Sequence, residues 1–161
     1  MATVDKNQAV IDFISTCPQI ANNPLFFNFI NAKNENKQII TVANDTATNK
    51  PYIDGSVKKR YTITLVDFKS ISYNPVVKLS GYSNENVDEI LDTQSIIDWV
   101  NEQADLRNYP DFGDDCEIDD MSVASNTPLL NGVDTSVSPQ LAQYGLTIYI
   151  DYIDNSKKLW R

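Results

Sequence analysis

The chain has 161 residues, 42% of them hydrophobic and 10% aromatic, and its formal net charge is −9. This length and apolar content predict one globular domain over residues 1–161 with a sizeable core, and they exclude wholesale disorder. The chain contains no histidine, so it lacks the commonest general base and the commonest zinc ligand. We therefore expect no enzymatic activity, no cofactor and no metal site.

Cysteine usage and the N-terminal sequence indicate where the protein is made. Cys17 and Cys116 are far apart and in no metal-binding spacing, so we expect two unlinked thiols in a reducing compartment. The first residues show no basic-then-apolar signal pattern, and no apolar run approaches the length of a membrane span. These features predict a soluble protein that is made in a cytoplasm and has no membrane partner.

The charge is unevenly distributed along the chain. Residues 1–83 contain nine Lys/Arg and six Asp/Glu, residues 84–154 contain one and sixteen, and residues 155–161 contain three and none. The three segments therefore carry +3, −15 and +3, which sum to −9. Such polarity suits a protein that meets partners, or copies of itself, through faces of opposite sign; the alternative is a solubilising acidic surface. The −15 segment disfavours tight binding to nucleic-acid phosphates.

The N-terminal region predicts one helix followed by two short strands. Thr3 is placed to cap a helix over Val4–Thr16, which Pro18 would end. Its apolar stripe has the spacing i, i+3, i+4, i+7 and consists of Val10, Phe13, Ile14 and Cys17. Leu25–Asn31 favours a strand, with a short buried aromatic knot as the alternative, and Gln38–Ala43 favours a second strand.

A polar loop and a long strand are expected next. Asn44–Ser56 carries a proline and an Asp-Gly turn signal, which indicate an exposed loop. Val57–Ser70 is expected to be a long strand because apolar and polar residues alternate along it. The alternation slips by one residue before Val66 and Phe68, and such a slip predicts a β-bulge.

The second half begins with a long helix. Asn84 is a suitable N-cap for a helix that runs to about Arg107. One side of this helix is apolar, with an aromatic residue at its edge: Ile90, Leu91, Ile96, Ile97, Trp99, Val100 and Ala104. The outer side is acidic and consists of Asp92, Asp98, Glu102 and Asp105. After it, Cys116–Ala124 is expected to be a strand and Thr127–Gln140 a loop.

The last strand, Gln143–Asp154, has the clearest periodic signal in the chain. Its apolar face consists of Tyr144, Leu146, Ile148, Ile150 and Tyr152, and we expect this face to lie under both helices. The elements follow the order α-β-β-β-α-β-β. Runs of strands rather than alternating βαβ units predict an α+β fold, with an antiparallel (mixed) sheet of four to five strands and two helices packed on one face.

A dense acidic cluster lies between the second helix and the last strand. It consists of Asp111, Asp114, Asp115, Glu117, Asp119 and Asp120. Carboxylate oxygens suit calcium or magnesium, but the spacing of a calcium-binding loop is absent. Because charge runs are usually solvated faces, we expect an acidic surface rather than a cation site.

Two basic segments are candidate interaction sites. Lys58, Lys59 and Arg60 begin the long strand. Contact with nucleic acid is one interpretation, and we favour a charged edge or strand end that resists unwanted pairing. Residues 155–161 form a basic C-terminal tail that includes Trp160, and Trp and Arg are enriched at interfaces. The alternative for Trp160 is docking on its own domain.

Packing and turn residues spread over nearly the whole chain carry a family resemblance. They are Val4-Asp5-Lys6, Asn23-Pro24-Leu25-Phe26-Phe27-Asn28-Phe29, Lys59-Arg60-Tyr61 running to Asp67-Phe68, Ile97-Asp98-Trp99-Val100-Asn101, Asn108-Tyr109-Pro110-Asp111-Phe112-Gly113, Asn131-Gly132-Val133-Asp134, and Leu141-Ala142-Gln143-Tyr144 leading into Asp151-Tyr152. In this pattern the chain resembles small minor capsid or tail-completion proteins of long-tailed phages of Gram-positive bacteria. The order of elements is also similar to the tail terminator fold of lambda-like phage tails.

The resemblance implies a structural function in the virion. In that fold six copies form a ring that caps the tail tube, ends its growth and joins the tail to the head. The implied partners are further copies of the chain, the major tail (tube) protein and a head-closure or connector protein. Phage DNA would pass through the lumen without specific binding, and the ring would lie at the head–tail neck after assembly in the host bacterial cytoplasm.

Two alternatives remain open. The first is another neck protein, such as a head-closure (stopper) component or a connector, and the second is an acidic DNA mimic that inhibits a host enzyme. For a ring, we expect contacts from the two long loops, Asn44–Ser56 and Thr127–Gln140, and from the C-terminal tail. The candidate interface residues are Asp54, Lys58, Lys59, Arg60, Asp134, Lys157, Lys158, Trp160 and Arg161.

Overall fold

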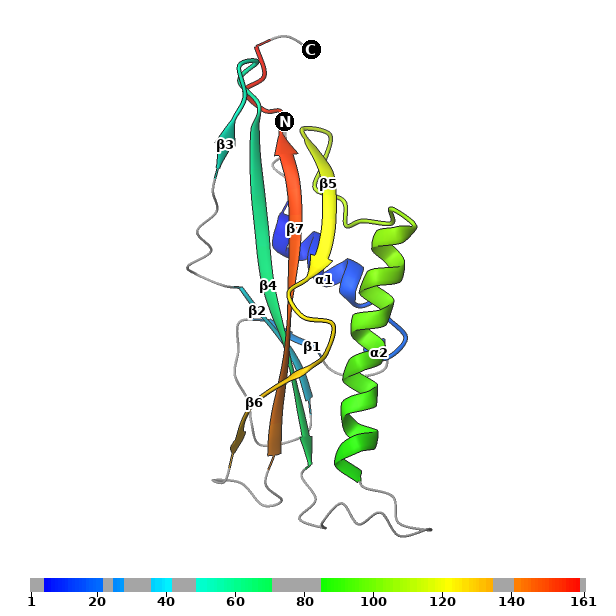
Figure 1. Cartoon of the computed structure of the whole chain (residues 1–161). Helices are drawn as coiled ribbons and strands as arrows, with labels where there is room; N and C mark the ends of the chain where they lie inside the picture. The colour runs from blue at the N-terminus through cyan, green and yellow to red at the C-terminus, as the bar shows by residue number, and fades with distance from the viewer. Residues whose placement is uncertain are drawn as a thin grey trace.

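The computed structural model describes residues 5–21, 25–27, 36–41, 49–70, 85–134 and 141–159. These residues form two helices and seven strands: α1 (Lys6–Ile14), β1 (Leu25–Phe27), β2 (Asn36–Thr41), β3 (Lys50–Pro51), β4 (Val57–Ser70), α2 (Glu85–Asp105), β5 (Cys116–Val123), β6 (Leu129–Asp134) and β7 (Leu141–Asp154). All seven strands belong to one sheet, and both helices share a single core on one of its faces (Figure 1). The expected α+β class is confirmed.

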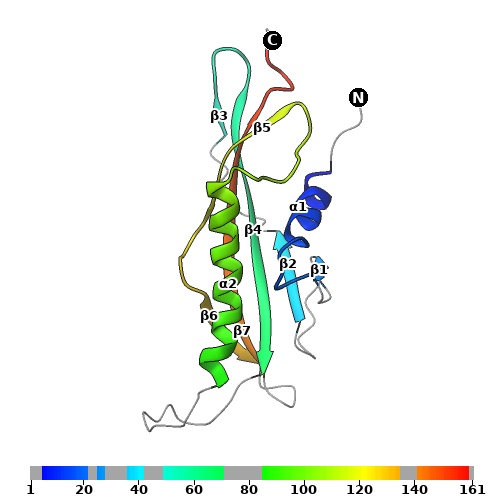
Figure 2. The ribbon, with the colours of Figure 1, turned by 90° about the vertical axis from the view of Figure 1, so that its right-hand side faces the viewer.

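The centre of the sheet is the pair of long strands β4 and β7. Each has 14 residues, and they pair antiparallel over their full length, from Val57 opposite Asp154 to Ser70 opposite Leu141. At about 3.3 Å per residue, this pair is roughly 45 Å long. It runs through the length of the molecule in both views (Figures 1 and 2). The predicted apolar face of β7 is buried, with exposed fractions of 8% or less for Tyr144, Leu146, Ile148, Ile150 and Tyr152.

Shorter strands line both outer edges of the central pair. β2 and β3 pair antiparallel with different parts of β4, while β5 and β6 pair antiparallel with different parts of β7. β1 pairs with β2 in parallel, so the sheet is mixed. Five strands follow one another across the sheet in the order β1-β2-β4-β7-β5, which agrees with the expected four to five. β3 and β6 are additional strands that pair with β4 and β7.

Two segments expected to be loops contain strands. β3 lies within Asn44–Ser56 and β6 lies within Thr127–Gln140. β3 has only two residues, and β6 begins with two adjacent leucines, so neither sequence alternates between polar and apolar residues. Their extended conformation comes from hydrogen bonding to the edges of β4 and β7. Residues 44–48 and 135–140 of these segments lie outside the described residues, as do residues 28–31 of the expected strand Leu25–Asn31 and residues 42–43 of the expected strand Gln38–Ala43.

Helix α1 begins two residues later than predicted. Its N-cap is Asp5, whose carboxylate accepts hydrogen bonds from the backbone N–H of Asn7 at 3.0 Å and of Gln8 at 3.3 Å. The prediction of a start at Val4 with Thr3 as cap is therefore wrong. Helix α1 also ends earlier than predicted, at Ile14, and the chain then continues through hydrogen-bonded turns around Pro18. The predicted apolar stripe is correct, since all four of its residues, Val10, Phe13, Ile14 and Cys17, are buried.

The buried side of α2 is centred on a threonine. Thr93, Ile96, Ile97 and Val100 are each 0% exposed, whereas Leu91 is 55% exposed, so its predicted place in the apolar stripe is wrong. At 100° per residue, Thr93 lies within about 60° of each of those three core residues, while Leu91 lies nearly opposite. The Thr93 hydroxyl donates a 2.9 Å hydrogen bond to the buried carboxylate of Asp67 on β4. This contact joins the helix to the central strand.

Aromatic side chains connect α1, α2 and the segment after α2 to the sheet. The rings of Phe13 and Trp99 lie 5.1 Å apart, and Phe112 contacts both Tyr61 (5.7 Å) and Tyr152 (5.3 Å). The Tyr61 hydroxyl donates a hydrogen bond to the side-chain oxygen of Asn7. Burial and then the nearby Asp5 carboxylate raise the pKa of Tyr61 to about 12, so it remains a neutral donor. These contacts place α1 over the upper half of β4 and β7.

The expected β-bulge in β4 is absent from its pairing with β7. The register between the two strands is continuous, and Val66 and Phe68 form a small second core with Leu141 on the face opposite the helices. The alternation slips because the end of β4 is buried on both faces. Bulges occur instead in β5, between Ile118 and Asp120, and in β6.

Truncation of a core residue on α2 should test this packing. We expect Ile97→Ala to lower the free energy of unfolding by about 2–5 kcal/mol, because it leaves a cavity between α2 and the central strands. Leu91→Ala on the same helix is the matched control and should change it by less than about 0.5 kcal/mol. Urea denaturation of both variants measures the difference, and equal losses would contradict the assignment of the buried side.

Candidate assembly surfaces

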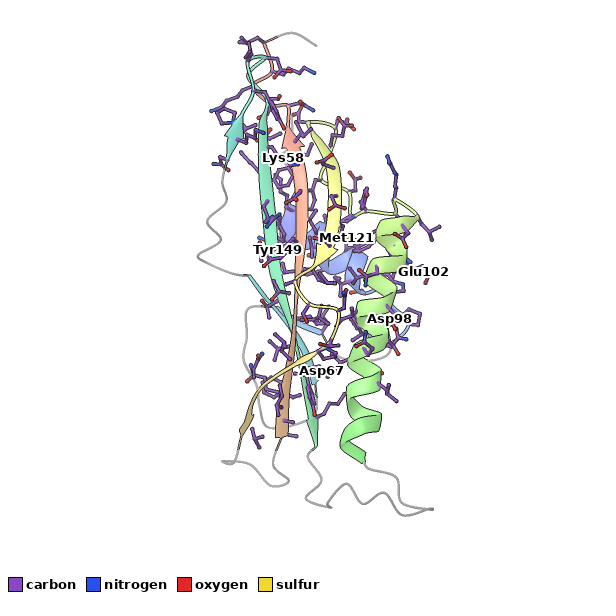
Figure 3. The ribbon with its side chains drawn as sticks, viewed as in Figure 1. Lys58, Asp67, Asp98, Glu102, Met121 and Tyr149 are labelled. Carbon is purple, nitrogen blue, oxygen red and sulfur yellow. The ribbon has the colours of Figure 1, made fainter. Side chains whose placement is uncertain are left out.

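The basic residues at the start of β4 are paired with carboxylates of the same chain. Lys58 and Arg60 lie on the helix-free face, where Lys58 Nζ is 2.7 Å from Asp119 Oδ2 and Arg60 Nε is 2.7 Å from Asp151 Oδ1. The second Arg60–Asp151 contact, at 3.1 Å, makes that pair bidentate. The Arg60 guanidinium also lies 4.5 Å from the centre of the Tyr149 ring. Figure 3 shows Lys58 and Tyr149 along the central strands.

Lys59 belongs to the opposite face of β4. Its Nζ is 2.8 Å from Asp154 Oδ2 at the end of β7. Burial alone would raise the pKa of Asp154, but the hydrogen bonds from Lys59 and Ser156 outweigh it and hold that pKa well below its usual range. The same hydrogen bond raises the pKa of Lys59. This ion pair therefore links the start of β4 to the end of β7.

These three residues lie at the start of β4, as expected for a charged strand end. The alternative of a sheet edge is wrong at Lys58, which lies opposite both Lys50 of β3 and Ile153 of β7. The three basic residues form ion pairs with aspartates of β5 and β7. Together with the pair between Lys69 and Asp92, these contacts engage four of the sixteen acidic residues of the −15 segment.

The turn between β3 and β4 forms the projecting tip of the sheet. It is closed by backbone hydrogen bonds from Tyr52 N–H to Ser56 O at 2.8 Å and from Gly55 N–H to Tyr52 O at 3.1 Å. The Asp54 carboxylate accepts hydrogen bonds from both the backbone and the hydroxyl of Ser56, and these lower the pKa of Asp54. Ile53 points out of this turn and is 95% exposed.

The C-terminal tail lies against this tip. The backbone N–H of Leu159 donates a 2.7 Å hydrogen bond to the carbonyl of Asp54, and Lys158 Nζ is 3.7 Å from the Asp54 carboxylate. Of the nine candidate interface residues, Asp54, Lys157 and Lys158 thus come together in one place. Leu159 is 71% exposed. Trp160 and Arg161 lie outside the described residues.

A second exposed apolar surface lies at the opposite end of β7. Strand β6 carries three exposed large apolar residues, Leu129, Leu130 and Val133, and pairs with β7 along one side only within the described part of the chain. Asp134 is the last residue of β6 and lies opposite Leu141 in the register. Sequence reasoning missed this surface because Leu129 and Leu130 were assigned to a loop, although two adjacent leucines in a polar segment are a usable signal.

The acidic residues spread along α2 and the segment after it. Asp98 and Glu102 are on α2 (Figure 3), and Asp98 and Asp105 are exposed. In the cluster of residues 111–120, Asp119 pairs with Lys58 and the Asp111 carboxylate accepts a 2.9 Å hydrogen bond from Gly113 N–H. Across the described ranges, no three His, Cys, Asp or Glu side chains are placed to hold a metal ion.

Comparison with known proteins finds no family whose model matches the chain and no matching curated protein. Among the helices that the structure describes, none is long and apolar enough to cross a membrane.

Substitution of Gly55 should loosen the tip. Gly55 has φ of +88°, and a Cβ at this position would lie 2.4 Å from the Lys157 carbonyl oxygen. We expect Gly55→Ala to lower the free energy of unfolding by more than about 1 kcal/mol and to speed hydrogen exchange at the Leu159 amide. Gly132→Ala is the matched control, since no atom lies within 4 Å of the added Cβ, and it should leave both quantities nearly unchanged.

Acid should weaken the pair between Lys59 and Asp154. Because the pKa of Asp154 is lowered by folding, its contribution is complete above the ordinary aspartate value of about 4 and is lost as the pH falls below it. We expect the melting temperature of Asp154→Asn to fall less steeply than that of the wild type between about pH 5 and pH 2. Asp114→Asn, at an exposed site, should follow the wild-type curve. Parallel curves for Asp154→Asn and the wild type would refute this linkage.

Proposed function

We propose that the protein is a structural component of a long-tailed phage virion: a tail terminator whose subunits form a ring that caps the tail tube, ends its growth and joins the tail to the head. A hexamer is the ring that the resemblance implies. The partners of this ring are the tube protein on one side and a head-closure or connector protein on the other, and DNA passes through its lumen.

The observation that carries this proposal is the exposed apolar strand β6. Monomeric proteins rarely expose contiguous apolar surface, and such surface marks sites of protein–protein contact. Leu130 and Val133 lie on one face of β6, opposite Tyr144 and Ala142 of β7, and Leu129 lies on the other face. The strand has one hydrogen-bonded neighbour in the described part of the sheet, so a second chain can pair with it and cover the exposed side chains. A protein that assembles through such a strand fits a ring subunit.

Two further features support a structural role. The sequence pattern shared with tail-completion proteins covers nearly the whole chain, and the α+β architecture with both helices on one face agrees with what that resemblance implies. The basic residues at the start of β4 form internal ion pairs, and acidic residues of α2 and of residues 111–120, among them Asp98, Glu102 and Asp114, are exposed. A negative lumen would repel DNA and allow it to slide.

The proposal is tested by removing the gene from the phage and examining the lysate by electron microscopy. We expect filled heads without attached tails and tail tubes of irregular length, because nothing ends tube growth. Supplying the wild-type protein from a plasmid should restore particles with tails of uniform length, and the Leu130→Glu variant should fail to do so. Folding of that variant is checked by its melting temperature.

Other results would identify the alternatives. Tails of normal length beside unattached heads would favour a head-closure (stopper) or connector protein. Normal virions produced in reduced number would favour an inhibitor of a host enzyme, as expected for an acidic DNA mimic. Either result would overturn the terminator assignment.

A further inference from the structure

A groove of about 450 Å³ lies between α1 and the segment that follows α2. Its apolar floor includes Phe13, Tyr109 and Pro110, and its rim includes Asp5, Asp12 and Asp111. The floor is held in place from below, since Phe13 is buried against Trp99 with the ring centres 5.1 Å apart. The groove therefore combines a fixed aromatic surface with three carboxylates.

The three carboxylates of the rim accept local hydrogen bonds and have no ion-pair partner among the described residues. One oxygen of Asp5 caps α1, one oxygen of Asp12 accepts a 2.7 Å hydrogen bond from Gln8, and Asp111 caps a turn. The ion pairs among the described residues engage other aspartates: Asp54, Asp92, Asp119, Asp151 and Asp154. A cation can thus enter the groove without breaking any of these ion pairs.

The C-terminal tail has the complementary chemistry. Its last five residues, Lys157–Arg161, read Lys-Lys-Leu-Trp-Arg and combine three cationic with two large apolar side chains. Leu159 is fixed to the tip through Asp54 and is exposed there, beside the exposed Ile53. An Arg or Lys over a carboxylate rim and an indole on an aromatic floor are favourable pairings at protein interfaces.

We infer that the groove of one subunit receives the C-terminal segment of a second copy. The tip at residues 52–56 and the tail residues 155–159 that lie against it contribute no residue to the groove, so the tail and the groove are two separate surfaces of one chain. A contact between different surfaces of identical chains is heterologous and closes into a ring where the rotation permits. This inference rests on the proposed function, and it names one of the contacts that would hold the ring together.

The test is a titration of a synthetic peptide of residues Asn155–Arg161 into the full-length Arg161→Glu protein, whose own tail should not compete. Saturable binding by calorimetry is expected. The single variant Asp12→Lys, which keeps its natural tail, should bind this peptide roughly tenfold or more weakly, because the substitution replaces attraction with repulsion for both the peptide and its own tail. A peptide with glutamate in place of Arg161 should bind the same Asp12→Lys protein more tightly than the natural peptide does.

Asp98→Lys is a closely matched control. Asp98 accepts a hydrogen bond from Gln94 on α2, just as Asp12 accepts one from Gln8 on α1, and both are exposed on a helix surface. It should leave peptide binding unchanged. Absence of binding, or equal weakening by the two substitutions, would overturn the inference. If the peptide binds but the gene-deleted phage still forms normal virions, the terminator function is rejected while the inferred contact stands.

Discussion

The structure depends on the full-length pairing of β4 with β7. Because Val57 to Ser70 faces Asp154 to Leu141 without a break, every other element is positioned by this one ladder. β2, β3, β5 and β6 add to its two edges, and both helices pack on the face that carries Ile63, Leu65, Ile148 and Ile150. Two long strands with continuous pairing form a stiff element, which suits a subunit that must transmit contacts from one end to the other.

The same pairing places different exposed residues at the two ends of the molecule. At the upper end, the turn before β4 and the tail after β7 are neighbours because the strands are antiparallel, and the Leu159–Asp54 hydrogen bond joins them. At the lower end, β6 pairs with the first residues of β7 and exposes Leu129 and Leu130. Exposed apolar residues at both ends, with ion-paired residues between them, leave the molecule suited to contact several neighbours.

The main elements could be predicted from the sequence where one side of an element is uniformly apolar. The alternation of Tyr144 to Tyr152 and the stripe of α1 both identified buried faces correctly. Thr93 and Asp67 were missed because a hydrogen bond between two buried polar side chains has no signature in hydrophobic periodicity. β3, β6 and the docking of the tail were missed because they depend on hydrogen bonds to distant residues rather than on local pattern. The paired state of Lys58, Lys59 and Arg60 likewise required the register of β4 with β7 and the placement of β5.

Electron cryo-microscopy of the intact virion, with the protein located by its fitted sheet, tests the proposed function most directly. We expect a ring of identical copies at the head-proximal end of the tail tube, with the C-terminal segment of each copy in the groove beside α1 of the next. Absence of the protein from the virion, or its location away from the junction between tube and head, would contradict it.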